Sequence, residues 1–285
     1  MINRMEFLRG EEKQRLYAAI GDQGSLLDLD LLDIARITGR LSRSQSWQPE
    51  AIRRQAALDG LWLSRWGQAC RFGTPEYPAD LAAIDDAPFV LFYRGNLPPS
   101  GSNLLAVVGT RQPSERARTA AWSIGRDCAG QGIGLVSGLA HGIDGAAHAG
   151  CVANGGYSVA VLAGGVDAVV PRLHRHLAER LLAEGGCLLS EYGPHTEMRK
   201  YRFPARNRII SGLCRLVLVV EAPEHSGALI TAQFALDQGR DVYVHAAGCQ
   251  GMTGIGTANL VENGARVIGH LGEMEFYGRC LDPGV

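Results

Sequence analysis

From residue 103 to residue 268, short apolar runs alternate regularly with stretches long enough to form helices. Few architectures accommodate that alternation. Strands that are apolar at every position, and that are separated by helices, are typical of a parallel sheet buried on both faces. Strands are therefore predicted at residues 104–108, 133–136, 158–162, 187–189, 216–220, 242–244 and 266–268.

Small or polar residues follow these strands at once, as in the segments 109–111 and 137–138. In an open α/β sheet, ligands bind outside the carboxyl ends of the strands. We therefore predict the α/β class, with an extended Rossmann-like parallel sheet whose strand ends converge on one crevice.

The first 70 residues have a different pattern. Apolar residues recur there at helical spacing, as at Leu16, Ile20 and Leu27, with Gly and Ser breaks between them. A proline-punctuated segment follows Phe72 and leads into a short aromatic run that is expected to join the sheet. Residues 1–70 are thus predicted to form a small helical domain, and residues 71–285 the Rossmann-like domain.

The charge balance limits the classes of partner. A net charge of -1 excludes a strongly basic protein, so any site for a polyanion must be local. Only Lys13 and Lys200 among the 28 basic residues are lysines, so arginine would make most phosphate contacts.

Neither a membrane nor a metal is indicated. No run approaches the length of a membrane span, and the first residues lack the apolar core of a signal peptide, so a cytoplasmic protein is predicted. The 7 cysteines, which extend to Cys280, include no Cys-x-x-Cys pair, and His141 and His148 have no third ligand at metal-site spacing. We predict no metal, no cofactor and no disulfide framework.

The most distinctive local feature is segment 199–208, in which five of ten residues are basic and Tyr201 and Phe203 are interleaved. Basic groups hold phosphates, and aromatic faces stack on unpaired bases for ~1–3 kcal/mol each. Asn207 and Arg208 are predicted to open a helix whose backbone donors reinforce an anion site. The alternative is a solvated basic loop with Phe203 tucked into the core.

Glycine-rich turns and strand-end carboxylates complete the candidates. The turns at 107–111 and 137–144 would let backbone N–H groups approach a phosphate, although packing alone also explains them. Ser226 is expected to cap a helix or to bind an anion. Glu191 and Glu221 have no spacing that pairs them as acid and base, and they are expected to be caps or arginine partners.

Taken together and in this order, these segments resemble the DNA-processing protein A family, also called DprA or Smf. The match extends from about Phe72 to Ile268. It includes Tyr77-Pro78, Val108-Gly109-Thr110-Arg111, Ser137-Gly138-Leu139-Ala140, Phe203-Pro204-Ala205-Arg206-Asn207-Arg208 and Ser226-Gly227. The N-terminal helices are similar to the sterile-alpha-motif-like domain of that family.

The resemblance implies a protein that is not an enzyme. It implies a homodimer that binds single-stranded DNA, protects it during natural transformation and helps to load the RecA recombinase. Carried over residue by residue, roles inside the DNA pocket fall on Gly109, Arg111, Ser137, Gly138, Gly142, Phe203, Arg206, Asn207 and Arg208, with Lys200 and Arg202 at the rim.

The sequence departs from the family pattern in three places. Residues 246–248 read Ala-Ala-Gly instead of Val-Pro-Gly, and His174 follows a Val-Pro segment in which Tyr-Pro-Asn is usual. The chain stops soon after Ile268, so the winged-helix domain of many relatives is expected to be absent.

Other functions stay open. One is a phosphoribohydrolase-like enzyme that uses Glu191 or Glu221, although the turn from Pro223 lacks the glycine pair and terminal acid of those enzymes. The others are a nucleotide-sensing domain with the same pocket, and a paralogue that acts in phage defence.

Overall fold

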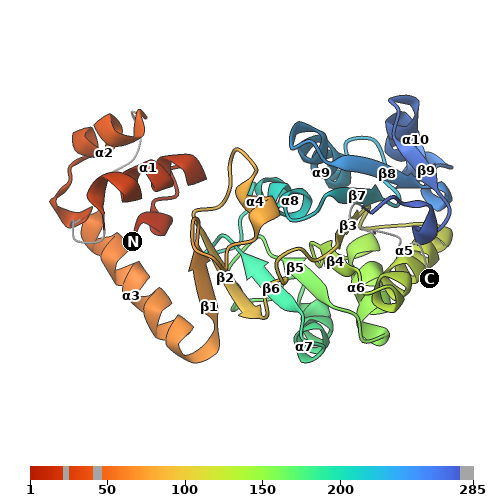
Figure 1. The fold of residues 1–285 in the computed structure, drawn as a ribbon, viewed down its shortest axis with the longest axis horizontal. Helices are drawn as coiled ribbons and strands as arrows, with labels where there is room; N and C mark the ends of the chain where they lie inside the picture. Colours follow the sequence, from red (N-terminus) through yellow and green to blue (C-terminus); the bar gives the residue numbers. More distant parts are fainter. Residues whose placement is uncertain (22–25, 41–46, 277–285) are drawn as a thin grey trace, which may run out of the picture.

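The computed structural model describes residues 1–21, 26–40 and 47–276 of the chain (Figure 1). All seven predicted strands are present, and each end lies within one residue of its predicted position. The strands run parallel to one another, which confirms an α/β fold with a Rossmann-like sheet. They are β3 (Leu104–Val108), β4 (Gly134–Ser137), β5 (Ser158–Val161), β6 (Cys187–Ser190), β7 (Leu216–Val219), β8 (Asp241–His245) and β9 (Arg266–Ile268).

One edge of the sheet differs from the prediction. The aromatic run joins the sheet as β2 (Val90–Gly95), which pairs antiparallel with β6. A further strand, β1 (Gln68–Arg71), pairs antiparallel with β2 and was not predicted, because its residues show neither alternation nor an apolar run. The nine described strands lie in the order β1-β2-β6-β5-β4-β3-β7-β8-β9.

Helices cover both faces of the sheet (Figure 1). On one face lie α5 (Glu115–Gly130), α6 (Ile143–Ala153) and α7 (Arg175–Ala183), and on the other α8 (Arg202–Gly212) and α9 (Gly227–Asp237). Leu105 in β3 packs with α5 and α6, whereas its neighbour Ala106 packs with α8 and α9. Because successive side chains point to opposite faces, burial of both faces requires an apolar residue at every position.

The N-terminal helices have a small core of their own. They comprise a 3-10 turn (Ile2–Arg4), α1 (Gly10–Ile20), α2 (Leu31–Thr38) and α3 (Pro49–Trp66). The core contains Met5, Leu8, Leu16, Leu26 and Ile34. In the part of the chain that the structure describes, no helix has the length and apolarity to cross a membrane. The described cysteines are free thiols, and Cys280 lies outside the described residues.

The order of the strands defines where a ligand is expected. From β3 the chain proceeds through β4, β5 and β6 toward one edge, and then returns to the other side of β3 with β7, β8 and β9. The direction therefore reverses between β3 and β7. In open α/β sheets such a topological switch point is where the ligand crevice forms.

Candidate nucleic-acid interface

A crevice of about 620 Å³ lies at the switch point. Its walls come from the loops after β3 and β4, from α8 and from the first turn of α9. Six of the predicted residues line it: Gly109, Arg111, Lys200, Phe203, Arg206 and Asn207. The loop after β5 does not line it, and the loop after β6 contributes only Lys200, so the strand ends converge only in part.

Two cations at the crevice carry uncompensated charge. Arg111 and Lys200 are exposed, and neither has a carboxylate within ion-pair distance among the residues the structure describes. The Arg111 guanidinium lies 5.4 Å from the centre of the half-buried Phe203 ring. The crevice therefore presents two cationic side chains that are available to bind phosphates, beside an aromatic side chain.

Arg206, by contrast, uses its donors inside the protein. Its buried guanidinium donates to the carbonyl oxygens of Gly138, at 3.0 Å, and Val161. Burial lowers the pKa of Arg206 to about 10, and the neighbouring Asp144 carboxylate opposes that shift. Arg206 therefore stays protonated at neutral pH, where it holds the loop after β4 in place.

Asp144 completes this support. Its carboxylate accepts hydrogen bonds from the backbone N–H groups of Gly138, at 3.1 Å, and Ala140, at 3.3 Å. Burial raises the pKa of Asp144, while Arg206 and these hydrogen bonds oppose the rise. The crevice wall after β4 is thus held by hydrogen bonds from the loop backbone to two buried side chains, Arg206 and Asp144.

Two other predicted residues join loops and do not line the crevice. The Ser137 hydroxyl is buried and donates to the Val107 carbonyl oxygen at 2.6 Å. Gly142 has φ +81°, and a Cβ at that position would lie 2.3 Å from the Thr110 carbonyl oxygen. Only glycine permits that approach, which brings the loop after β4 against the loop after β3.

We expect Gly142→Ala to lower the free energy of unfolding by about 1–3 kcal/mol, because it adds both a strained φ and a steric overlap with Thr110. Chemical denaturation measures the change. Gly130→Ala is the matched control, because the space around Gly130 is open and its φ is ordinary. Equal stability of the two variants would contradict the close approach of the loops.

Asn207 joins α8 to the start of α9, which Ser226 caps. The Asn207 side-chain amide donates to the Gly227 carbonyl oxygen at 3.1 Å. The Ser226 hydroxyl accepts from the Ala228 N–H at 3.3 Å, so it is the N-cap of α9. These bonds fix the part of the crevice wall beside Arg206, whose Nε donates to the Asn207 side-chain oxygen at 3.2 Å.

The structure places two predicted arginines elsewhere. α8 begins at Arg202, five residues before the predicted start, with Pro204 in its first turn, where the missing N–H breaks no helical hydrogen bond. Arg202 is buried and pairs with Glu6. Arg208 pairs with Glu191 at 2.7 Å. Contrary to the prediction, Arg202 is not at the rim and Arg208 is not in the crevice.

The strand-end carboxylates are already engaged. Glu221 is fully buried and accepts from the Ser114 N–H, at 2.7 Å, and from the Thr253 hydroxyl, at 2.9 Å. Glu191 holds Arg208. Neither carboxylate is available as the general base that the phosphoribohydrolase-like alternative requires.

Several lining residues were not predicted. Thr110, Gln112 and Pro204 directly neighbour predicted residues, so the motif positions themselves were the available signal.

His174 lies at one of the departures from the family pattern. Its ring contacts the Leu139 carbonyl oxygen, in the loop after β4, at 2.8 Å.

Residues 68–275 match the model of the family described as DNA recombination-mediator protein A. DNA processing protein DprA of Streptococcus pneumoniae is 40% identical over 204 residues, which cover 70% of this chain and 72% of that protein. Protein Smf of Synechocystis is 42% identical over 198 residues, which cover 68% of this chain and 50% of that protein.

Two solved structures have a similar fold, one over almost the whole chain and the other over about three quarters of it. The X-ray structure of DprA from Streptococcus pneumoniae has a TM-score of 0.78 and 34% identity, and covers 97% of each chain. That of DprA from Helicobacter pylori, described for its single-stranded DNA binding mode, has a TM-score of 0.63 and 25% identity, and covers 73% of this chain and 93% of that one. The chain belongs to the DNA recombination-mediator protein A family.

Proposed function

We propose that the protein binds single-stranded DNA in the crevice, as a recombination factor of the cytoplasm that does no covalent chemistry on the strand. The observation that carries this proposal is the pair of uncompensated cations, Arg111 and Lys200, beside the Phe203 ring at the switch point. Cations bind the phosphates of a strand, and an aromatic face binds an unpaired base. The likeness to the Helicobacter pylori protein supports the same substrate.

Discrimination between single strands and duplex is the direct test. A single-stranded oligonucleotide is expected to compete at least about tenfold better than a blunt duplex of equal length, because only unpaired nucleotides enter the crevice and stack on Phe203. Electrophoretic mobility shift with single-stranded, duplex and mononucleotide competitors measures the difference. Equal competition by the duplex would contradict the proposal.

The wider role includes assembly. We propose a homodimer that protects single-stranded DNA during natural transformation and delivers it to RecA, since two linked crevices raise affinity through effective concentration. Light scattering is expected to give twice the chain mass, and addition of the protein is expected to speed RecA filament formation on DNA. A monomer with full affinity at all concentrations would contradict the dimer.

A further inference from the structure

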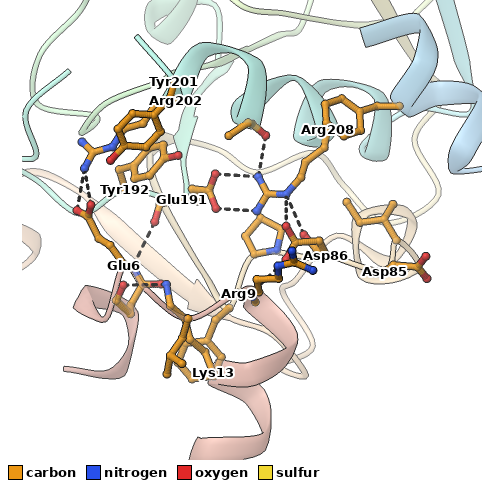
Figure 2. Close-up of a pocket in the computed structure, with 18 of the residues that line it drawn as sticks. Glu6, Arg9, Lys13, Asp85, Asp86, Glu191, Tyr192, Tyr201, Arg202 and Arg208 are labelled. Atoms are coloured by element: carbon orange, nitrogen blue, oxygen red, sulfur yellow. Dashed lines mark hydrogen bonds and ion pairs between the residues drawn. The ribbon is translucent and has the colours of Figure 1, made fainter. Parts of the chain in front are cut away.

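A second cavity, also of about 620 Å³, lies between the N-terminal helices and the sheet domain (Figure 2). We call it the interdomain cavity. One wall comes from residues 3–13, and the other from residues 83–89, from the loop after β6, from α8 and from the end of α9. The cavity is within the volume range of small-molecule sites in proteins, about 300–1,000 Å³.

The two cavities lie on different faces of α8. Arg202, Ala205 and Arg208 line the interdomain cavity, whereas Phe203, Arg206 and Ile210 line the crevice. Residues three or four apart share one face of a helix. A ligand in the interdomain cavity therefore occupies a site separate from the DNA crevice.

Two of the acidic side chains that line the interdomain cavity, Glu6 and Glu191, pair with arginines. Both oxygens of Glu6 accept from Arg202 at 2.8 Å. Both oxygens of Glu191 accept from Arg208, at 2.8 and 2.7 Å (Figure 2). These carboxylates are therefore neutralised by their own partners.

Lys13 has no such partner. Its ammonium donates to the Asn3 carbonyl oxygen at 3.1 Å, and within residues 1–21, 26–40 and 47–276 no carboxylate lies in ion-pair distance of it. An ammonium has three N–H donors, so two remain. Burial lowers the pKa of Lys13, although Glu191 and Glu6 oppose that shift. An anionic ligand would accept hydrogen bonds from the two remaining N–H donors and would balance the charge of this half-buried ammonium.

Arg9 extends the cationic side. It precedes Lys13 by one helical turn, lines the same cavity and is exposed, with no carboxylate in ion-pair distance in the described part of the chain. Figure 2 shows both side chains on the N-terminal segment, below Arg208. Ile84, Phe89 and Phe234 give the cavity an apolar stretch. The remaining acidic residues of its lining are Asp85, Asp86 and Asp237, of which Asp86 pairs with Arg208 at 3.1 Å. The cavity thus combines a cationic end with an apolar wall that suits a flat ring.

We propose that the interdomain cavity binds one nucleotide unit, with its phosphate at Lys13 and Arg9 and its base against the apolar wall. The unit is a free nucleoside monophosphate or the phosphorylated 5′ end of a DNA strand. The assignment of a nucleotide, rather than another aromatic phosphate, rests on the proposed function in single-stranded DNA binding.

The lysine content makes the test selective. The chain has only two lysines, and each lines one cavity: Lys13 the interdomain cavity and Lys200 the crevice. Brief acylation with an N-hydroxysuccinimide ester, followed by mass spectrometry of peptides, reports the reactivity of each. dAMP at ten times its dissociation constant should slow labelling of Lys13 about tenfold and leave Lys200 unchanged.

The outcomes separate the two sites. Protection of Lys200 but not Lys13 by dAMP would overturn the proposal, and equal protection of Lys13 by inorganic phosphate would overturn its assignment to a nucleotide. An unphosphorylated oligonucleotide that fails to protect Lys200 would contradict DNA binding in the crevice, whatever happens at Lys13. A 5′-phosphorylated oligonucleotide that protects both lysines identifies a strand end as the source, and protection of Lys13 by dAMP alone identifies a free nucleotide.

Matched variants complete the test by calorimetry. Lys13→Met keeps an unbranched side chain that is one atom shorter and removes its charge. It should weaken dAMP binding at least about tenfold, as expected for a charge-assisted hydrogen bond. Lys13→Arg should retain most of the affinity, and Lys200→Met should retain all of it. Circular dichroism confirms folding. Equal dAMP affinity in folded Lys13→Met and the parent protein would overturn the proposal.

Discussion

Replacement of Arg111 by alanine is expected to weaken single-stranded DNA binding about 10- to 150-fold. Arg111 is exposed at the crevice and lacks a carboxylate partner within the described residues, so its charge is available to a phosphate. A charge-assisted hydrogen bond to a preorganised site contributes about 1.5–3 kcal/mol, which corresponds to that range. The plot of log affinity against log salt should also lose roughly 0.7 in slope, the contribution of one phosphate on a single strand.

Salt titrations of Arg111→Ala and Lys200→Ala measure both effects. Arg126→Ala is the matched control, because Arg126 is an exposed arginine near the far end of α5 from the crevice. The control should bind like the parent. If folded Arg111→Ala also bound like the parent, the crevice would not be the DNA site.

Replacement of Arg208 by alanine is expected to act on stability, with a loss of about 3–5 kcal/mol in the free energy of unfolding. The guanidinium and the Glu191 carboxylate form two hydrogen bonds, at 2.8 and 2.7 Å, with side chains only 10% and 18% exposed. Removal of the arginine leaves the carboxylate without its partner in a partly buried place. The unpaired negative charge of Glu191 is then costly to bury, and this cost lowers the free energy of unfolding.

Urea denaturation measures this loss. Arg215→Ala, which breaks the exposed ion pair with Asp80, is the control and should cost less than about 1 kcal/mol. The double variant Arg208→Met with Glu191→Leu should recover most of the stability, because the only carboxylate then left without Arg208 is that of Asp86, which is 46% exposed. An effect of Arg208→Ala as small as that of the control would contradict a structural role for the pair.

The sheet was predictable because its signal is local. Each parallel strand is buried on both faces, so the requirement for apolar residues is present in the strand itself, as at residues 104–108. β1 carries no such signal, because it lies at an edge and two of its residues are exposed. The crevice followed from the strand ends, and Gly109 and Arg111 lie where that rule places them.

The faces of α8 on which Arg202 and Arg208 lie are determined by residues outside their own motif. A basic run shows which charges are present, but the start of α8 determines which face each one occupies. The partner of Arg202 is Glu6, 196 residues earlier in the chain, and no local pattern links the two. Long-range pairing therefore decided which arginines face the crevice and which are structural.

That separation has a consequence for synthesis on the ribosome. Asn3, Arg4 and Glu6 bind partners 188, 192 and 196 residues later, at Glu191, Thr196 and Arg202. At about 5–20 residues per second, roughly 10 to 40 s pass before those partners are made. During that interval the first helices have their own small core and the contacts of α1 with Arg71, Asp86 and Phe89. The nascent chain must therefore complete most of its sheet before Asn3, Arg4 and Glu6 can bind these partners.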